Sequence, residues 1–188
     1  MLQTHHSLVA PALLCALVPS VLFVAAHGQT ASAADAKLPL RAALVLTPEF
    51  CSTRIKQKAE RFEVGQAACV ELEPALEGTF SSLTRVAEAP SSGDLQVVLL
   101  PRFVNAGATT KVGFSKKIMV VLLEWTVKDL SGKTVWFETV QGSAKGGQGN
   151  LFTYKGDLRR LVEDSVKDAA QQSASKMSSA PELRKLAQ

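Results

Sequence analysis

The feature that most constrains the fold of this chain is a run of alternating side chains over residues 116–129, KKIMVVLLEWTVKD. Between 119 and 127, the residues that share one side of an extended strand are all apolar, namely Met119, Val121, Leu123, Trp125 and Val127. The opposite side begins with three apolar residues, Ile118, Val120 and Leu122, and then turns polar. The run therefore predicts a long strand that is buried along one face and apolar over half of the other.

Further strands are predicted on both sides of this run. Residues 129–132, DLSG, form a hairpin turn, and residues 133–144 return as the partner strand. Residues 38–47, LPLRAALVLT, and 95–104, LQVVLLPRFV, have the apolar content of buried strands. Residues 84–88 are an optional short strand, whereas 52–63 and 105–115 are expected to be exposed or flexible connections.

Two segments change to helical periodicity. Between 64 and 83, apolar residues recur at spacings of three and four, and Pro74 interrupts the pattern. Residues 158–177 form the second helix, with Asp157 as its N-cap and an apolar inner stripe. The predicted fold class is α+β, an antiparallel or mixed sheet of about four strands with two helices packed on one face as a two-layer sandwich.

The N-terminal segment has the features of an export signal. Residues 8–26 are apolar and uncharged, and Ala31-Ser32-Ala33 matches the small-x-small pattern before a cleavage site. We expect a signal peptide over 1–34, a single α+β domain over 35–177 and a flexible C-terminal tail over 178–188. Cleavage after Ala25-Ala26, an uncleaved membrane anchor and lipidation at Cys15 remain alternatives. The expected location is the periplasm or the cell envelope.

The distribution of histidine limits the chemistry of the exported protein. His5, His6 and His27 all lie before the predicted cleavage site, so the mature chain would contain no imidazole. Without imidazole or a dense acidic cluster, His-dependent hydrolysis and designed metal sites are not expected. We therefore predict no catalytic residues, no metal and no cofactor.

Three short segments resemble functional motifs, but each lacks a residue or a structural context that the motif requires. Ser131-Gly132-Lys133-Thr134 resembles the end of a phosphate-binding loop, but the required earlier glycine is Val127 and strands flank the segment. Gly147-x-Gly149 lacks the third glycine of a dinucleotide-binding loop. Ser173 and Lys176 match a Ser-x-x-Lys pattern but are expected on the surface of the last helix, which leaves a Ser–Lys hydrolase as a remote hypothesis.

Cys51 and Cys69 are the two cysteines that follow the predicted signal peptide. In an oxidising compartment, two cysteines in one small domain favour a disulfide, and two buried thiols are the alternative. The bridge would close a loop of about 18 residues and contribute on the order of 3 kcal/mol.

One surface is a candidate for binding. It combines the second face of the long strand with nearby cations, and its residues are Phe114, Lys116, Lys117, Ile118, Val120 and Leu122. Apolar side chains rimmed by cations suit an acyl chain with an anionic headgroup, or an apolar protein partner. The alternative is that another strand, the tail or the export segment covers this face. The net charge of +4 is modest, and no nucleic-acid partner is expected.

The strand 117–127, the turn 128–133, the strand 134–140 and the closing helix 157–177 together resemble a known group of proteins. The layout is similar to the lipoprotein that plugs the lipopolysaccharide translocon of the outer membrane, and to the accessory lipoproteins of envelope lipid transport. This resemblance implies an envelope location, no catalysis, and binding to an outer-membrane protein or to lipopolysaccharide. Those proteins carry a lipidated first residue, whereas here two leucines precede Cys15.

These observations together predict a non-catalytic exported envelope protein that binds a lipid or a membrane-protein partner as an assembly or transport accessory. The alternative is a ligand-free structural or stress-related periplasmic domain.

Overall fold

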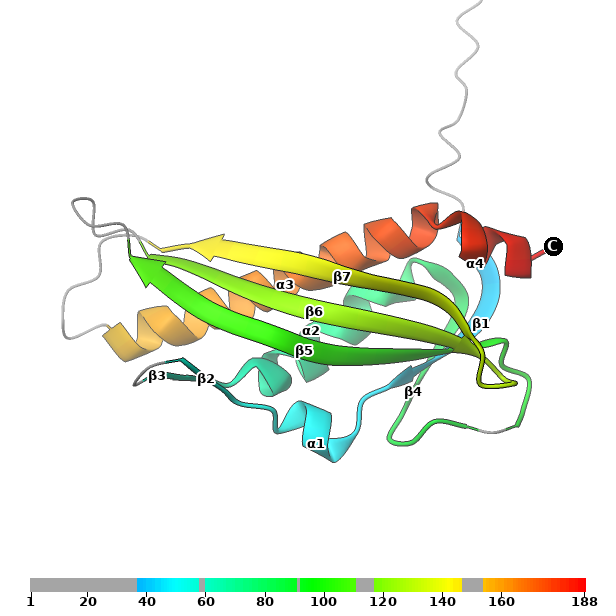
Figure 1. Cartoon of the computed structure of the whole chain (residues 1–188), viewed down its shortest axis with the longest axis horizontal. Coiled ribbons are helices and arrows are strands. Elements are labelled where there is room, and N and C mark those ends of the chain that lie inside the picture. Colours follow the sequence, from blue (N-terminus) through cyan, green and yellow to red (C-terminus); the bar gives the residue numbers. More distant parts are fainter. Residues whose placement is uncertain (1–36, 58–59, 91, 111–116, 147–153) are drawn as a thin grey trace, which may run out of the picture. The chain divides into compact units, whose positions relative to one another are not determined.

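A computed structural model describes residues 37–188 apart from 58–59, 91, 111–116 and 147–153 (Figure 1). Its main sheet has the strand order β4-β1-β5-β6-β7. The strands are β1 (Leu38–Val45), β4 (Phe80–Val86), β5 (Val97–Thr110), β6 (Lys117–Asp129) and β7 (Thr134–Lys145). The predicted export signal and its alternatives lie outside the described residues.

The sheet is mixed. Strand β1 pairs in parallel with β4 and with the first residues of β5, whereas β5, β6 and β7 form an antiparallel meander. The sequence predicted about four strands, and the structure has five in this sheet. The optional strand at 84–88 starts earlier than expected, at Phe80, because the first helix already ends at Glu77.

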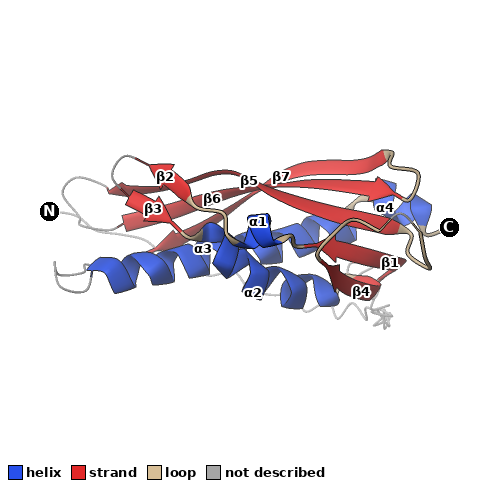
Figure 2. Cartoon of the chain, turned by 90° about the horizontal axis from the view of Figure 1, so that it is seen from below, coloured by secondary structure: helices blue, strands red, loops and turns tan. Residues whose placement is uncertain are grey.

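Helices cover one face of this sheet (Figure 2). The two long ones are α2 (Val64–Glu77) and α3 (Tyr154–Ser179), and the two short ones are α1 (Pro48–Cys51) and α4 (Pro181–Leu186). The predicted two-layer α+β arrangement is therefore present, with two more helices than expected. Residues 178–188 contain α4 instead of an irregular tail, and Leu183 anchors that helix because its side chain is fully buried.

The interior between the sheet and the helices is apolar. Helix α3 places its predicted stripe there, since Leu161, Val166 and Ala169 are among its buried residues. Strand β6 contributes Trp125, which is the largest fully buried side chain. Gly142 on β7 allows α3 to approach closely, because a Cβ there would lie 2.0 Å from the carbonyl oxygen of Ser165.

A smaller layer lies beside β5. Strands β2 (Ile55–Gln57) and β3 (Glu60–Phe62) form an antiparallel hairpin within 52–63, where the sequence predicts an exposed connection. The Gln57 side-chain oxygen accepts a hydrogen bond from the Ala108 amide at 2.9 Å. This contact ties the hairpin to the half of β5 that does not pair with β1.

Helix α1 is held in place by three different interactions. The Thr47 hydroxyl accepts from the Phe50 amide and caps the helix. The Phe50 ring stacks on Phe103 of β5, with 5.3 Å between the ring centroids. The structure also contains the bridge expected from the sequence, because a disulfide joins Cys51 of α1 to Cys69 of α2.

Candidate functional site

The candidate site is built on the alternation of side chains along β6. The predicted inner set from Met119 to Val127 is fully buried against the helices. Ile118, Val120 and Leu122 point to the opposite side, which we call the outer face, and each is half-buried. We call these three residues the apolar stripe.

Residues of the neighbouring strands border the apolar stripe, and the Gln57 side chain of β2 lies against Gly107 beside Val120. Across β5 the stripe residues pair with Thr109, Gly107 and Asn105. Across β7 they pair with Lys145, Ser143 and Gln141. Side chains of directly paired residues lie on the same face of a sheet, so the stripe is bordered by small or polar groups on both sides. None of the described helices lies over this face (Figure 2).

The polar half of the outer face continues along the same strands. Arg102 donates through Nε and Nη2 to one carboxylate oxygen of Glu124, at 2.8 Å and 2.7 Å. The next row contains Thr126 between Leu100 and Phe137. Phe137 is 56% exposed, which is unusual for a phenylalanine side chain. Large apolar groups therefore occur on both sides of the Arg102–Glu124 pair.

Lysines lie at both ends of the outer face. Lys145 is exposed and pairs across the strands with Ile118, and Lys128 is half-buried at the opposite end of β6. The only acidic side chain of the β6 outer row up to Lys128 is Glu124, which Arg102 already compensates. The stripe is thus accompanied by net positive charge within the described part of the chain.

Only some of the predicted binding residues lie on the outer face in the structure. It brings Ile118, Val120 and Leu122 together on one face. The alternation of β6 puts Lys117 on the side of Met119, so it does not share their face. Phe114 and Lys116 lie outside the described residues. Sequence reasoning missed the exposure of Phe137 and of Val104, which are 56% and 48% exposed.

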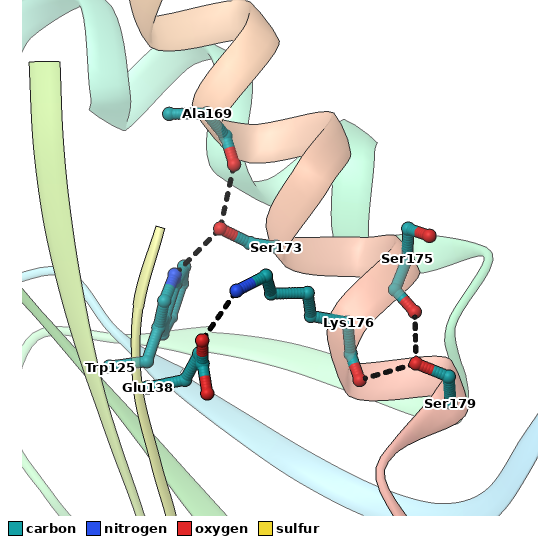
Figure 3. Close-up of polar contacts among 7 residues, drawn as sticks. All are labelled: Trp125, Glu138, Ala169, Ser173, Ser175, Lys176 and Ser179. Carbon is teal, nitrogen blue, oxygen red and sulfur yellow. Dashed lines mark hydrogen bonds and ion pairs between the residues drawn. The ribbon is translucent and has the colours of Figure 1, made fainter. Parts of the chain in front are cut away.

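Helix α3 protects part of the free edge of β7. The Ser143 amide, which points away from β6, donates to Asp168 of α3 at 2.7 Å. Lys176 forms an ion pair with Glu138 (Figure 3). Charged contacts at an edge strand hinder pairing with another chain. The sequence offered no signal for these contacts, because Asp168 reads as an ordinary exterior residue of a helix.

The residues of the Ser-x-x-Lys pattern have structural partners instead of each other. Ser173 was expected on the surface, but its side chain is fully buried. Its hydroxyl accepts a 2.7 Å hydrogen bond from the Trp125 indole and donates to the Ala169 carbonyl at 2.7 Å (Figure 3). Lys176 is engaged by Glu138. This arrangement provides no activated serine nucleophile at this position.

Two further observations concern the described residues alone. They contain no group of three or more His, Cys, Asp or Glu side chains that could hold a metal ion. None of their helices is long and apolar enough to cross a membrane.

The chain is similar to solved structures in its fold. A Xanthomonas campestris protein of family DUF330 superposes with a TM-score of 0.54 at 10% sequence identity, over 74% of this chain and 83% of that chain. A minor lipoprotein from Acinetobacter baumannii gives a TM-score of 0.46 at 13% identity, over 76% of this chain and 93% of that chain. Uncharacterized lipoprotein B from Nitrosomonas europaea gives 0.44 at 12% identity, over 76% and 84%.

No protein-family model and no curated protein matches the sequence. The similarity to the Xanthomonas campestris protein concerns the fold alone.

Proposed function

We propose that this chain is a non-catalytic, exported protein of the cell envelope that binds an anionic lipid or a membrane-protein partner through the outer face of its sheet. The observation that carries the proposal is the apolar stripe, three aligned aliphatic side chains on a sheet face over which no described helix lies. Contiguous apolar groups at such a position mark interaction sites more often than isolated exposed residues do.

The charges of the outer face support the lipid arm of the proposal. An acyl chain would lie along the apolar stripe, and Lys145 beside Ile118 would meet the anionic headgroup. Lys128 offers a second cation at the far end of the same strand. A membrane surface could engage both lysines at once, because it presents many headgroups.

The exposed aromatic group supports the protein arm. Phenylalanine is enriched in the cores of protein interfaces, and Phe137 lies on the outer face next to Thr126. Together with Val104 it extends the apolar area beyond the stripe, on either side of a charged pair. A broad surface of this kind suits a second protein better than one small molecule, which prefers a concave pocket.

The envelope location rests on three kinds of support. The apolar segment 8–26 has the composition of an export signal. The Cys51–Cys69 disulfide suits an oxidising compartment. Two of the proteins with a similar fold are named lipoproteins.

The test is a double substitution on the outer face, Val120→Asp with Leu122→Asp. Both side chains are half-buried and point away from the helices, so the fold should survive. Ser82→Asp with Thr84→Asp is the matched control, since it adds the same two charges to exposed positions on β4. The natively purified proteins are tested by flotation with phosphatidylglycerol and phosphatidylcholine vesicles, and by cross-linking in membranes.

The outcomes separate the candidates. Flotation with phosphatidylglycerol vesicles that only the outer-face variant loses supports the lipid arm. Loss of a cross-link to a membrane protein, without vesicle binding, supports the protein arm. Unchanged binding of the outer-face variant contradicts the proposal. If that variant unfolds and the natural chain binds neither, the ligand-free structural domain is the better description.

A further inference from the structure

The helix side of the molecule carries a second surface of different character. A groove of about 690 Å³ is lined by residues of β3, the first half of α2 and the first turns of α3. Its floor is apolar, because Phe62, Ala67 and Val162 line it and are buried. Val70 also lines the groove and is 65% exposed, the highest exposure among the large apolar side chains of the described residues.

The rim of this groove is acidic. Four carboxylates and two guanidinium groups line it. Glu163 pairs with Arg159 at 2.8 Å, and Glu63 pairs with Arg54 at 3.0 Å. Glu60 and Glu71 have no ion-pair partner among the described residues, although both are half-buried. The whole chain has a net charge of +4, so the acidic rim of this groove differs in sign from the chain as a whole.

We propose that the groove docks a peptide segment of a partner protein in which an apolar side chain is flanked by Lys or Arg. The volume lies within the roughly 300–1,000 Å³ that is typical of sites for compact ligands, so it suits one or two side chains better than a whole helix. The apolar side chain would lie on the buried floor and cover Val70, which is 65% exposed, so that apolar surface is removed from water.

The unpaired carboxylates decide the charge of the occupant. A cation that reaches Glu60 or Glu71 would find an acceptor that has no competing ion-pair partner among the described residues. The rim has four carboxylates against two guanidinium groups, so an anionic headgroup would meet a net negative charge and would be repelled. The charge of the groove therefore selects against the ligands that suit the outer face, and the two surfaces can be tested separately.

The experiment uses a defined probe. A fluorescein-labelled, amidated nonapeptide of alternating lysine and leucine is titrated with the full chain, and its anisotropy is measured. The same peptide with glutamate in place of lysine is the charge control. We expect the lysine peptide to bind and the glutamate peptide to bind at least about ten-fold more weakly, as expected where like charges replace opposite ones.

Two pairs of variants locate the binding. Glu60→Gln with Glu71→Gln should weaken binding by about five-fold or more, since each exposed ion pair is worth up to about five-fold in affinity. Glu88→Gln with Asp94→Asn removes the same charge elsewhere and should leave it unchanged. Val70→Lys should abolish binding, whereas Leu186→Lys, on another exposed apolar residue, should not.

The proposal is overturned if the glutamate peptide binds as tightly, if both charge-neutralised pairs weaken binding equally, or if Val70→Lys binds normally. The outer-face variant with Asp at 120 and 122 should still bind the lysine peptide. If that variant loses the peptide, the probe binds the outer face and the assignment to the groove is wrong.

Discussion

The buried hydrogen bond between Trp125 and Ser173 allows the sharpest prediction about the stability of the fold. Ser173→Ala removes the acceptor of the indole N–H, and both side chains are fully buried. The indole nitrogen can only donate, and a buried donor without a partner costs its full desolvation free energy. We expect the free energy of unfolding to fall by about 1–3 kcal/mol.

A Trp125→Phe protein tests whether the loss of stability comes from the unsatisfied indole N–H. In a Trp125→Phe protein, Ser173 has no indole to accept from, but its hydroxyl still donates to the Ala169 carbonyl. The further change Ser173→Ala should then cost at most about 0.5 kcal/mol, because alanine favours the helix. The double-mutant cycle should therefore give a coupling of about 1–2 kcal/mol between the two positions.

Ser165→Ala is the matched control. Ser165 is equally buried on the same helix, and its hydroxyl donates to the Val162 carbonyl without accepting from an indole. We expect a change below about 0.5 kcal/mol. Urea unfolding followed by far-ultraviolet circular dichroism measures all five proteins. If Ser173→Ala costs the same in the Trp and Phe backgrounds, or no more than Ser165→Ala, the argument from the unsatisfied indole is refuted.

Three further predictions concern other parts of the fold. Gly142→Ala should destabilise the protein by about 1–3 kcal/mol or more in urea unfolding, because the new Cβ would lie 2.0 Å from the Ser165 carbonyl oxygen; unchanged stability would show that α3 moves freely over β7. Replacing Cys51 and Cys69 by serine should cost about 3 kcal/mol, measured the same way, and natural protein under reducing conditions should match it. The pKa of Asp129 lies below its ordinary value because the Ser131 hydroxyl and the Ser131 and Lys133 amides donate to the carboxylate. Its contribution to stability is therefore present above its unfolded pKa of about 3.9 and lost as pH falls through the lower folded pKa, so Asp129→Asn should reduce the acid dependence of unfolding in that window.

The sequence was most informative where one strand or helix contains its own repeated pattern. The alternation of β6 and the stripe of α3 each extend over more than ten residues, and the structure buries the predicted sides. The turn between β6 and β7 was also predictable. Gly132 there has a positive φ of 84°, which glycine adopts without strain.

The sequence was least informative where a distant contact determines the structure. Residues 105–110, NAGATT, carry no strand pattern, yet they extend β5 because each pairs with β6. The hairpin β2–β3 is mostly polar in sequence, and its contacts to the rest of the fold include the Gln57–Ala108 hydrogen bond and the buried Phe62. Helix α4 has few apolar residues, and its position depends on the burial of Leu183.

The candidate site was predictable to the same extent. The apolar stripe followed from periodicity alone. The exposure of Phe137 depends instead on which parts of the chain pack near the edge strand β7, and a periodic pattern does not show that. Lys117 was predicted as a cation at the border of the stripe, and because side chains alternate along a strand it lies on the side of Met119.

The two proposed surfaces lie on opposite sides of the main sheet and select opposite charges. The outer face combines an apolar stripe with Lys128 and Lys145, and the groove combines an apolar floor with Glu60 and Glu71. The packed apolar core that contains Trp125 lies between them, and no shared side chain links the two surfaces among the residues named for each. Ligands at the two surfaces should therefore bind independently, which is what a protein needs if it is to hold a cationic segment of one partner close to an anionic membrane. If Val120→Asp with Leu122→Asp changed the affinity for the lysine peptide, or Glu60→Gln with Glu71→Gln changed flotation with phosphatidylglycerol vesicles, the two surfaces would not be independent.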